Sequence, residues 1–132
     1  MNNYNQNLLS LYVHWPYCES KCPYCDFNSH VNETINANDW IKSYKNQLLA
    51  MKEELIENEI NFKNLNTLFF GGGTPSLMPL KVIEFIIDIS SEIFGFKQDI
   101  EITLEANPNS YDSKKFIRFK QLGINRISIG AQ

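Results

Sequence analysis

Hydrophobic and polar residues recur along this chain in a pattern that predicts strands separated by helices. Between Leu8 and Trp15 every second residue is apolar, which is the period of a strand with one buried face. Apolar residues then recur at helical spacing from Asn38, a suitable N-cap, to Leu55. The first part of the chain therefore predicts one strand, an irregular segment to about Asn36 and one helix.

The alternation of strand and helix continues to the end of the chain. Three further strands and two further helices are predicted, with strands at 66–70, 100–105 and 126–130 and helices at 79–95 and 112–122. Pro79 suits the first turn of its helix, and Gly95 and Gly123 suit the ends of the two helices. This order is typical of an α/β fold with parallel strands.

Polar residues alternate with apolar ones in the first, third and fourth strands, whereas strands covered on both faces are usually continuously apolar. The apolar set is expected to face the helices and includes Ile100, Ile102, Leu104, Ile127 and Ile129. The polar set is expected to line the inner wall of a curved sheet and comprises Tyr12, His14, Thr67, Glu101, Thr103, Glu105, Arg126, Ser128 and Gln132. Because closed barrels fill that wall with branched apolar side chains, we expect a wider interior that holds a ligand.

All three cysteines lie in the stretch 12–27, which reads YVHWPYCESKCPYCDF. Cys18, Cys22 and Cys25 form a C-x3-C-x2-C array, and the sequence has no fourth cysteine. A structural zinc site uses four protein ligands, whereas an iron–sulfur cluster held by three cysteines keeps one iron open. The array therefore favours a cluster that binds a small molecule.

Two other uses of these cysteines stay open. One is a zinc site completed by His14 or His30, although most structural zinc sites pair two short Cys/His segments. The other is a disulfide with one free thiol, which is disfavoured because the chain opens without a signal-peptide pattern. We accordingly expect a cytoplasmic protein with reduced cysteines.

Composition bounds the remaining possibilities. The chain has 132 residues, 43% of them hydrophobic, which suits one domain at 8–132 after a flexible N-terminus at 1–7. Its formal net charge is -3 and the basic residues are scattered, so nucleic acid is not an expected partner. Charges interrupt the apolar runs, so no membrane-spanning segment is expected.

Four stretches, in this order, resemble the radical S-adenosylmethionine (SAM) enzymes: the cysteine stretch 12–27, TLFFGGGTPS at 67–76, EITLEANP at 101–108 and GINRISIGAQ at 123–132. The similar branch contains oxygen-independent coproporphyrinogen III oxidases and haem chaperones. The resemblance implies a TIM-like (βα) barrel, of which this chain supplies about three βα units and a fourth parallel strand. It also implies a 4Fe–4S cluster on the three cysteines, SAM at the open iron and a SAM-derived radical that abstracts hydrogen from a substrate.

The resemblance further implies which residues contact SAM. They are Tyr12, Tyr24, Gly72, Gly73, Thr74, Glu105 and Gln132. Each assignment has an alternative. The glycines could simply form a turn, Glu105 could be a polar residue of the inner wall whose hydrogen bonds are satisfied within the protein, and the tyrosines could serve only in packing. Active sites of parallel α/β folds form at the carboxyl ends of the strands, so we expect these residues and the cysteine loop to share one rim. No residue is assigned a catalytic role.

Two departures from the family pattern shape the functional expectation. The oxidases carry a further cysteine two positions after the third one, where this chain has Phe27, and the sequence CDF resembles the chaperone pattern. The chain is also shorter than a complete barrel of roughly 200 residues or more. We expect the N-terminal part of a radical SAM protein of porphyrin metabolism; the alternatives are a haem chaperone without oxidase activity and an inactive truncated product.

The expected partners follow from the same resemblance. They are the cofactor, a tetrapyrrole such as haem, an electron-donor protein and a membrane-associated haem acceptor. A second copy of the chain is a further expected partner, because the fourth strand would leave an open edge.

Overall fold

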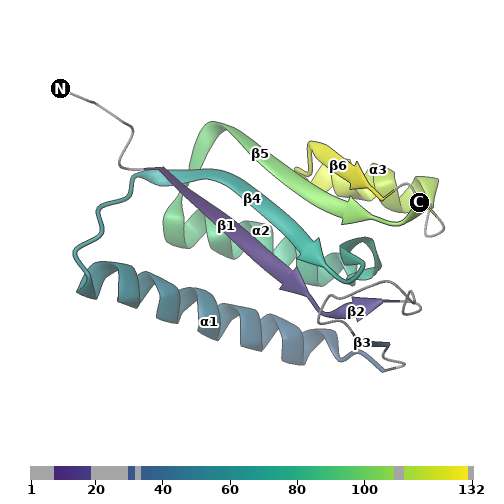
Figure 1. Cartoon of the computed structure of the whole chain (residues 1–132), viewed down its shortest axis with the longest axis horizontal. Helices are drawn as coiled ribbons and strands as arrows, with labels where there is room; N and C mark the ends of the chain where they lie inside the picture. Colours follow the sequence, from purple (N-terminus) through teal and green to yellow (C-terminus); the bar gives the residue numbers. More distant parts are fainter. Residues whose placement is uncertain (1–7, 19–29, 32–33, 109–111, 131–132) are drawn as a thin grey trace.

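The computed structural model describes residues 8–18, 30–31, 34–108 and 112–130. The expected flexible segment 1–7 lies outside this part of the chain. The elements, shown in Figure 1, are β1 (Leu8–Trp15), β2 (Tyr17–Cys18), β3 (His30–Val31), α1 (Ala37–Glu57), β4 (Asn64–Gly72), the short 3-10 helix η1 (Pro75–Leu77), α2 (Leu80–Phe94), β5 (Phe96–Ala106), α3 (Ser113–Leu122) and β6 (Arg126–Ile129).

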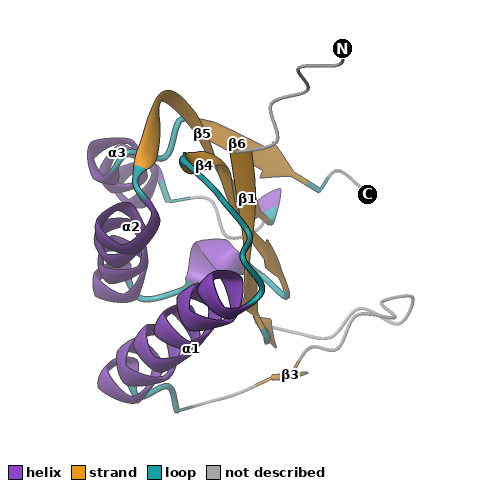
Figure 2. Cartoon of the chain, turned by 90° about the vertical axis from the view of Figure 1, so that its left-hand side faces the viewer, coloured by secondary structure: helices purple, strands orange, loops and turns teal. Residues whose placement is uncertain are grey.

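The main sheet has four parallel strands in the order β1-β4-β5-β6. Helices α1, α2 and α3 all lie on one side of this sheet, and its other face carries no helix in the described part of the chain (Figure 2). The expected α/β architecture, three βα units followed by a fourth parallel strand, is confirmed.

The core lies between this sheet and the helices. Apolar side chains of the strands, such as Leu68, Phe70 and Leu104, are fully buried, as are Val82 and Ile83 of α2. Each buried side chain of this size contributes about 1.5–3 kcal/mol relative to an exposed one. The predicted division of the sheet holds along β1, where Val13 is buried, because strand side chains point alternately to opposite faces.

The polar wall is only partly a solvent-exposed surface. Tyr12 is 56% exposed on the open face, whereas Thr103 is buried although it belongs to the polar set. In the strand register Ile129 shares the face of Ile127, which packs against the core, but Ile129 itself is 57% exposed. Ile129 is the last residue of an edge strand, where fewer neighbours cover a side chain.

Helix α1 begins before the predicted position. Its N-cap is Asn36, whose Oδ1 accepts hydrogen bonds from the backbone N–H groups of Asn38 (3.0 Å) and Asp39 (3.2 Å). Asn38 is therefore in the first turn, and its own side chain accepts a hydrogen bond from Lys81. Asn36 and Asn38 have equal capping ability, and the apolar spacing of the helix alone does not choose between them.

Other element ends also differ from the predictions. Pro79 stands at the cap of α2 instead of in its first turn, while Gly95 and Gly123 end their helices as expected. Strand β4 includes Gly71 and Gly72, and β5 begins directly after Gly95. These strands are longer than predicted, because pairing with a neighbouring strand retains residues of low strand propensity.

A second, two-stranded parallel sheet was not predicted. Tyr17 pairs with His30 and Cys18 pairs with Val31, within the segment expected to be irregular. The pair joins the two ends of the cysteine loop, so this loop starts and finishes at one place.

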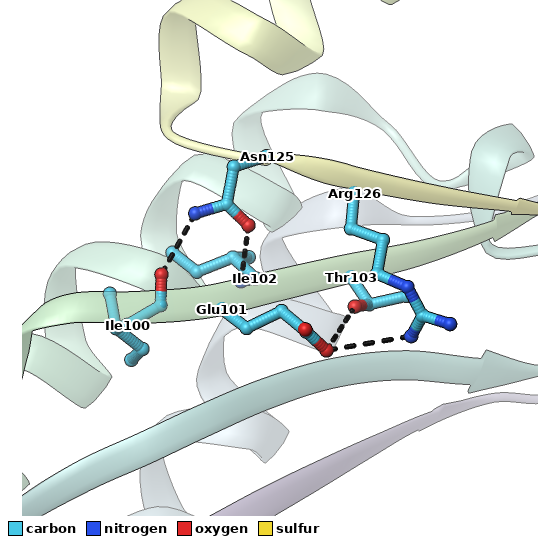
Figure 3. Close-up of polar contacts among 6 residues, drawn as sticks. All are labelled: Ile100, Glu101, Ile102, Thr103, Asn125 and Arg126. Atoms are coloured by element: carbon cyan, nitrogen blue, oxygen red, sulfur yellow. Dashed lines mark hydrogen bonds and ion pairs between the residues drawn. The ribbon is translucent and has the colours of Figure 1, made fainter.

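Asn125 links β5 to the turn that precedes β6 (Figure 3). Its Nδ2 donates to the carbonyl oxygen of Ile100 at 2.8 Å, and its Oδ1 accepts from the N–H of Ile102 at 2.9 Å. The Asn125 amide thus hydrogen-bonds to the main chain of β5 with both its donor and its acceptor, as a neighbouring strand would.

In the described part of the chain, none of the helices has the length and apolar character that a membrane span needs.

Candidate functional site

The glycine segment after β4 is bonded to the chain that leads into the cysteine loop. The N–H of Gly73 donates to the carbonyl oxygen of Trp15 at 2.6 Å, and the N–H of Thr74 donates to that of Tyr17 at 2.8 Å. Both bonds lie at the carboxyl ends of β1 and β4, the rim where parallel α/β folds place their sites. The glycine segment and the entry to the cysteine loop are therefore one structural unit.

Two of the glycines have no room for a side chain. Gly72 has a φ of 111°, and a Cβ there would lie 2.5 Å from the carbonyl oxygen of Trp15 and 2.8 Å from the His14 ring. A Cβ on Gly73 would lie 3.0 Å from Sγ of Cys18. A Cβ at either glycine would clash with a main-chain carbonyl group, that of Trp15 for Gly72 and that of Tyr17 for Gly73, so close backbone packing accounts for both glycines.

Glu105, at the end of β5, reaches across to the glycine segment. Its Oε2 accepts a hydrogen bond from the N–H of Gly72 at 3.2 Å. The other oxygen, Oε1, has no hydrogen-bond partner among the described residues. The hydrogen bond fixes one oxygen of this carboxylate at the glycine segment.

Tyr12 lies close to the same carboxylate. Its pKa is raised, first by partial burial and second by the negative charge of Glu105. The Tyr12 hydroxyl is hydrogen-bonded to Nδ1 of His14 at 3.1 Å, and its ring stacks on that of Phe69 at a centroid distance of 6.0 Å. Tyr12 is therefore held as a neutral phenol beside the Glu105 carboxylate.

A cluster of aromatic rings, here called the aromatic base, joins α1 to the start of the cysteine loop. The ring of Trp40 lies 5.2 Å from that of Trp15, 5.6 Å from that of Tyr17 and 5.5 Å from that of Tyr44. The Tyr44 hydroxyl donates to the carbonyl oxygen of His14 at 2.6 Å. Helix α1 thus fixes the end of β1.

The contribution of α1 to this site was missed by sequence reasoning. Trp40 and Tyr44 fall at ordinary core positions of a helix, and their spacing gives no sign of a second role. Only the hydrogen bond of Tyr44 reveals it, because that bond joins residues thirty positions apart in the sequence.

The structure brings six of the predicted site residues to one rim: Cys18, Tyr12, Gly72, Gly73, Thr74 and Glu105. The predicted residues Cys22, Cys25, Tyr24 and Gln132 lie outside the described part of the chain, as does the side chain of His30. Within the described ranges, no group of three or more His, Cys, Asp and Glu side chains is placed to hold a metal ion.

The residues present fit the cofactor that the motifs imply. Cys18 is a half-buried free thiol, and its sulfur lies near Gly73, since a Cβ added to that glycine would be 3.0 Å from it. The lack of a Cβ at Gly73 lets the Tyr17 carbonyl group approach the glycine segment closely. The carboxylate of Glu105 adds an acceptor for a cationic group.

A separate groove lies away from this rim. Its volume is about 450 Å³, and it is lined mainly by apolar side chains of β1 (Leu9, Leu11), of the second half of α1 (Met51, Leu55) and of the segment after α1 (Ile60). It does not include the glycine segment or Cys18. The candidate site therefore rests on the rim contacts.

Comparison with known proteins places this arrangement in a family. The family model described as the radical SAM superfamily matches residues 12–132. The haem chaperone HemW of Haemophilus influenzae is 41% identical over 125 residues, which are 94% of this chain and 32% of that protein. The mitochondrial radical S-adenosyl methionine domain-containing protein 1 of Bos taurus is 33% identical over 123 residues, 93% of this chain and 27% of that protein.

A solved structure has the same fold. Coproporphyrinogen III oxidase from Escherichia coli, described as a radical SAM enzyme, superposes with a TM-score of 0.82 and 27% sequence identity. The match covers 98% of this chain and 29% of that protein. The chain thus spans about a third of the length of the curated relatives it matches.

Proposed function

This chain belongs to the radical SAM superfamily, and from that membership we propose that it forms the cofactor-binding part of a radical SAM protein. In this proposal Cys18, Cys22 and Cys25 hold a 4Fe–4S cluster and leave one iron open for SAM. The observation that carries the proposal is the bonding of the glycine segment to the chain that enters the cysteine loop, through Gly73 to Trp15 and Thr74 to Tyr17.

The residues of this rim would bind and orient SAM. The N–H groups of Gly72, Gly73 and Thr74 already donate to Glu105, Trp15 and Tyr17, so their carbonyl oxygens are the groups proposed to accept from the amino group of SAM. Glu105 supports this by holding the N–H of Gly72 while keeping Oε1 available to a cationic or hydroxyl group. When bound, the cluster supplies an open coordination position and one-electron reduction of the SAM sulfonium. Tyr24 and Gln132 are proposed as further SAM contacts because of their positions in the family motifs.

We further propose that the whole protein acts in porphyrin or haem metabolism. Relatives named haem chaperone share up to 41% identity with the chain, compared with 27% for the coproporphyrinogen III oxidase structure. Phe27 stands where the oxidases have a further cysteine. Both facts favour a cytoplasmic haem-binding chaperone that transfers haem to a membrane-associated acceptor and receives electrons from a donor protein. Oxidative decarboxylation of a porphyrinogen is the second candidate.

The experiment that tests the cluster is anaerobic reconstitution with iron and sulfide, followed by metal analysis. We expect about four iron atoms per chain and near-complete loss in Cys18→Ser, Cys22→Ser and Cys25→Ser. Ser20→Ala is the control, because it changes the same loop without removing a thiol. A cluster that persists in Cys22→Ser would overturn the proposal, and stoichiometric zinc in its place would support the zinc alternative.

Haem titration separates the two candidates for the whole protein. Tight haem binding without cleavage of SAM supports the chaperone. Turnover of coproporphyrinogen III with cleavage of SAM supports the oxidase.

A further inference from the structure

A basic segment lies near the end of a chain that is acidic overall. From Asp112 to Arg126 the sequence has five basic residues and one acidic residue, whereas the formal net charge of the whole chain is -3. Two of the basic residues, Lys114 and Lys115, are in the first turn of α3, where the helix dipole favours acidic side chains. The placement of this charge therefore does not serve the stability of the helix.

The exposed side of α3, here called the α3 stripe, combines this charge with an apolar side chain. The stripe consists of Lys114, Ile117, Arg118 and Gln121, which are all exposed and whose spacing places them on one face of the helix. Ile117 is 59% exposed. Lys114 and Arg118 form no ion pair with another described residue, and Arg118 donates a hydrogen bond to Gln121 at 2.9 Å. The stripe thus presents an isoleucine between two cationic side chains.

The groove between β1 and α1 has the opposite charge at its margin. Glu54 lines the groove, and the sequence from Glu53 to Glu59 has four glutamates and no basic residue. Glu54 is in the last turn of α1, where the helix dipole favours basic side chains, and it has no ion pair within the described ranges. Met51 and Ile60, which also line the groove, are 36% and 47% exposed. An apolar side chain flanked by cations therefore matches this groove.

The α3 stripe does not reach the groove of its own chain. Figure 2 shows α2 between α1 and α3 on the same side of the sheet. The strand order β1-β4-β5-β6 also places β1, which lines the groove, at the opposite edge of the sheet from β6, which follows α3. The two complementary surfaces can therefore meet only between two copies of the chain.

We propose that the α3 stripe of one copy binds in the groove between β1 and α1 of a second copy. Ile117 enters the groove, as an apolar anchor of a helix does in a helix-in-groove contact. Lys114 lies against Glu54, and opposite charge on the two surfaces favours the encounter. Since each copy has one stripe and one groove, the contact is head-to-tail and continues from copy to copy. It uses neither the cysteine rim nor the open edge of β6, so it is independent of the proposed function.

Sedimentation velocity of the chain over a range of concentrations tests this contact. We expect association at about 0.02 M salt that weakens at about 0.5 M salt, because salt screens the attraction between exposed charges. Lys114→Glu and Glu54→Lys are each expected to weaken association about tenfold, because each substitution places like charges opposite each other. A mixture of the two variants should associate as the natural chain does, since every contact between unlike variants pairs opposite charges.

The variants also separate loss of the contact from loss of the fold. Both charge reversals agree with the helix dipole, so urea unfolding should find each variant at least as stable as the natural chain. Lys45→Glu and Glu84→Lys are the matched controls, because they reverse exposed charges on helices outside the stripe and the groove. Ile117→Ser is expected to weaken association at both salt concentrations, since it removes the apolar part of the contact.

Three results would overturn the proposal. The first is a chain that stays monomeric at low salt. The second is association that neither reversal weakens, which would assign it to another surface such as the open edge of β6. The third is a mixture of the two variants that associates no better than either variant alone, because opposite charges at Lys114 and Glu54 would then not be in contact.

Discussion

The hydroxyl group of Tyr44 donates a hydrogen bond to the main-chain carbonyl oxygen of His14 at 2.6 Å. It connects the middle of α1 to the end of β1, an edge strand of the main sheet. The next residue, Trp15, gives its own carbonyl oxygen to Gly73. The geometry of the rim therefore depends on a helix that contributes no ligand to it.

Removal of this hydroxyl is expected to destabilise the chain in a pH-dependent way. Tyr44→Phe leaves the His14 carbonyl without this donor, which costs about 1–2 kcal/mol near neutral pH. Burial is the main reason that the pKa of Tyr44 is raised, with nearby tyrosines second. A raised pKa means that the folded state holds the proton more tightly, so this stability is present below a pH of about 10 and is lost above it.

Urea unfolding of the two proteins at about pH 8 and about pH 10.5 measures this difference. The gap in free energy of unfolding between the natural chain and Tyr44→Phe should narrow at the higher pH. A gap that is constant or wider there would contradict the assigned role of the hydroxyl.

Gly72 is expected to tolerate no side chain. Gly72→Ala places a methyl group against the carbonyl oxygen of Trp15 at a φ of 111°, so backbone must move. We expect a loss of about 3 kcal/mol in the free energy of unfolding, measured by chemical denaturation. Gly130→Ala is the control, because a Cβ there meets nothing within 4 Å. Similar stabilities of the two variants would refute this explanation of the glycine.

The negative charge of Glu105 is expected to contribute to the raised pKa of Tyr12. Glu105→Gln keeps an oxygen that can accept from Gly72 and removes the negative charge, so the pKa of Tyr12 should fall. Part of the elevation should persist, because burial is its larger cause. NMR of ¹³C-labelled tyrosine measures the shift, with Glu101→Gln as the control. An unchanged Tyr12 pKa in Glu105→Gln, or an equal fall in the control, would argue against this pairing.

The general fold could be predicted because the spacing of apolar residues identifies most of the strands and helices. Alternation in β1 assigns Val13 to the core and Tyr12 to the open face, and both assignments are confirmed. The start of α1 was predicted two residues late, with Asn38 as the N-cap, because only hydrogen-bond geometry identifies Asn36 as the cap. The β2–β3 pair escaped prediction because strands of two residues have no periodicity to detect.

The candidate site was accessible to sequence reasoning only in part. Parallel strands place their carboxyl ends together, which is why Gly72 and Glu105 could be expected at one rim, and they are in contact. Their contacts with SAM stay a prediction. The register that sets Arg126 opposite Thr103 and the bond from Tyr44 to His14 depend on three-dimensional packing, for which the sequence carries no local signal.

Electron paramagnetic resonance of the reconstituted, reduced chain with and without SAM tests the central claim most directly. The account predicts the signal of a reduced 4Fe–4S cluster that changes when SAM is added, because Cys18, Cys22 and Cys25 leave one iron open to it. A cluster signal that SAM does not alter would contradict the proposal that this rim binds the cofactor.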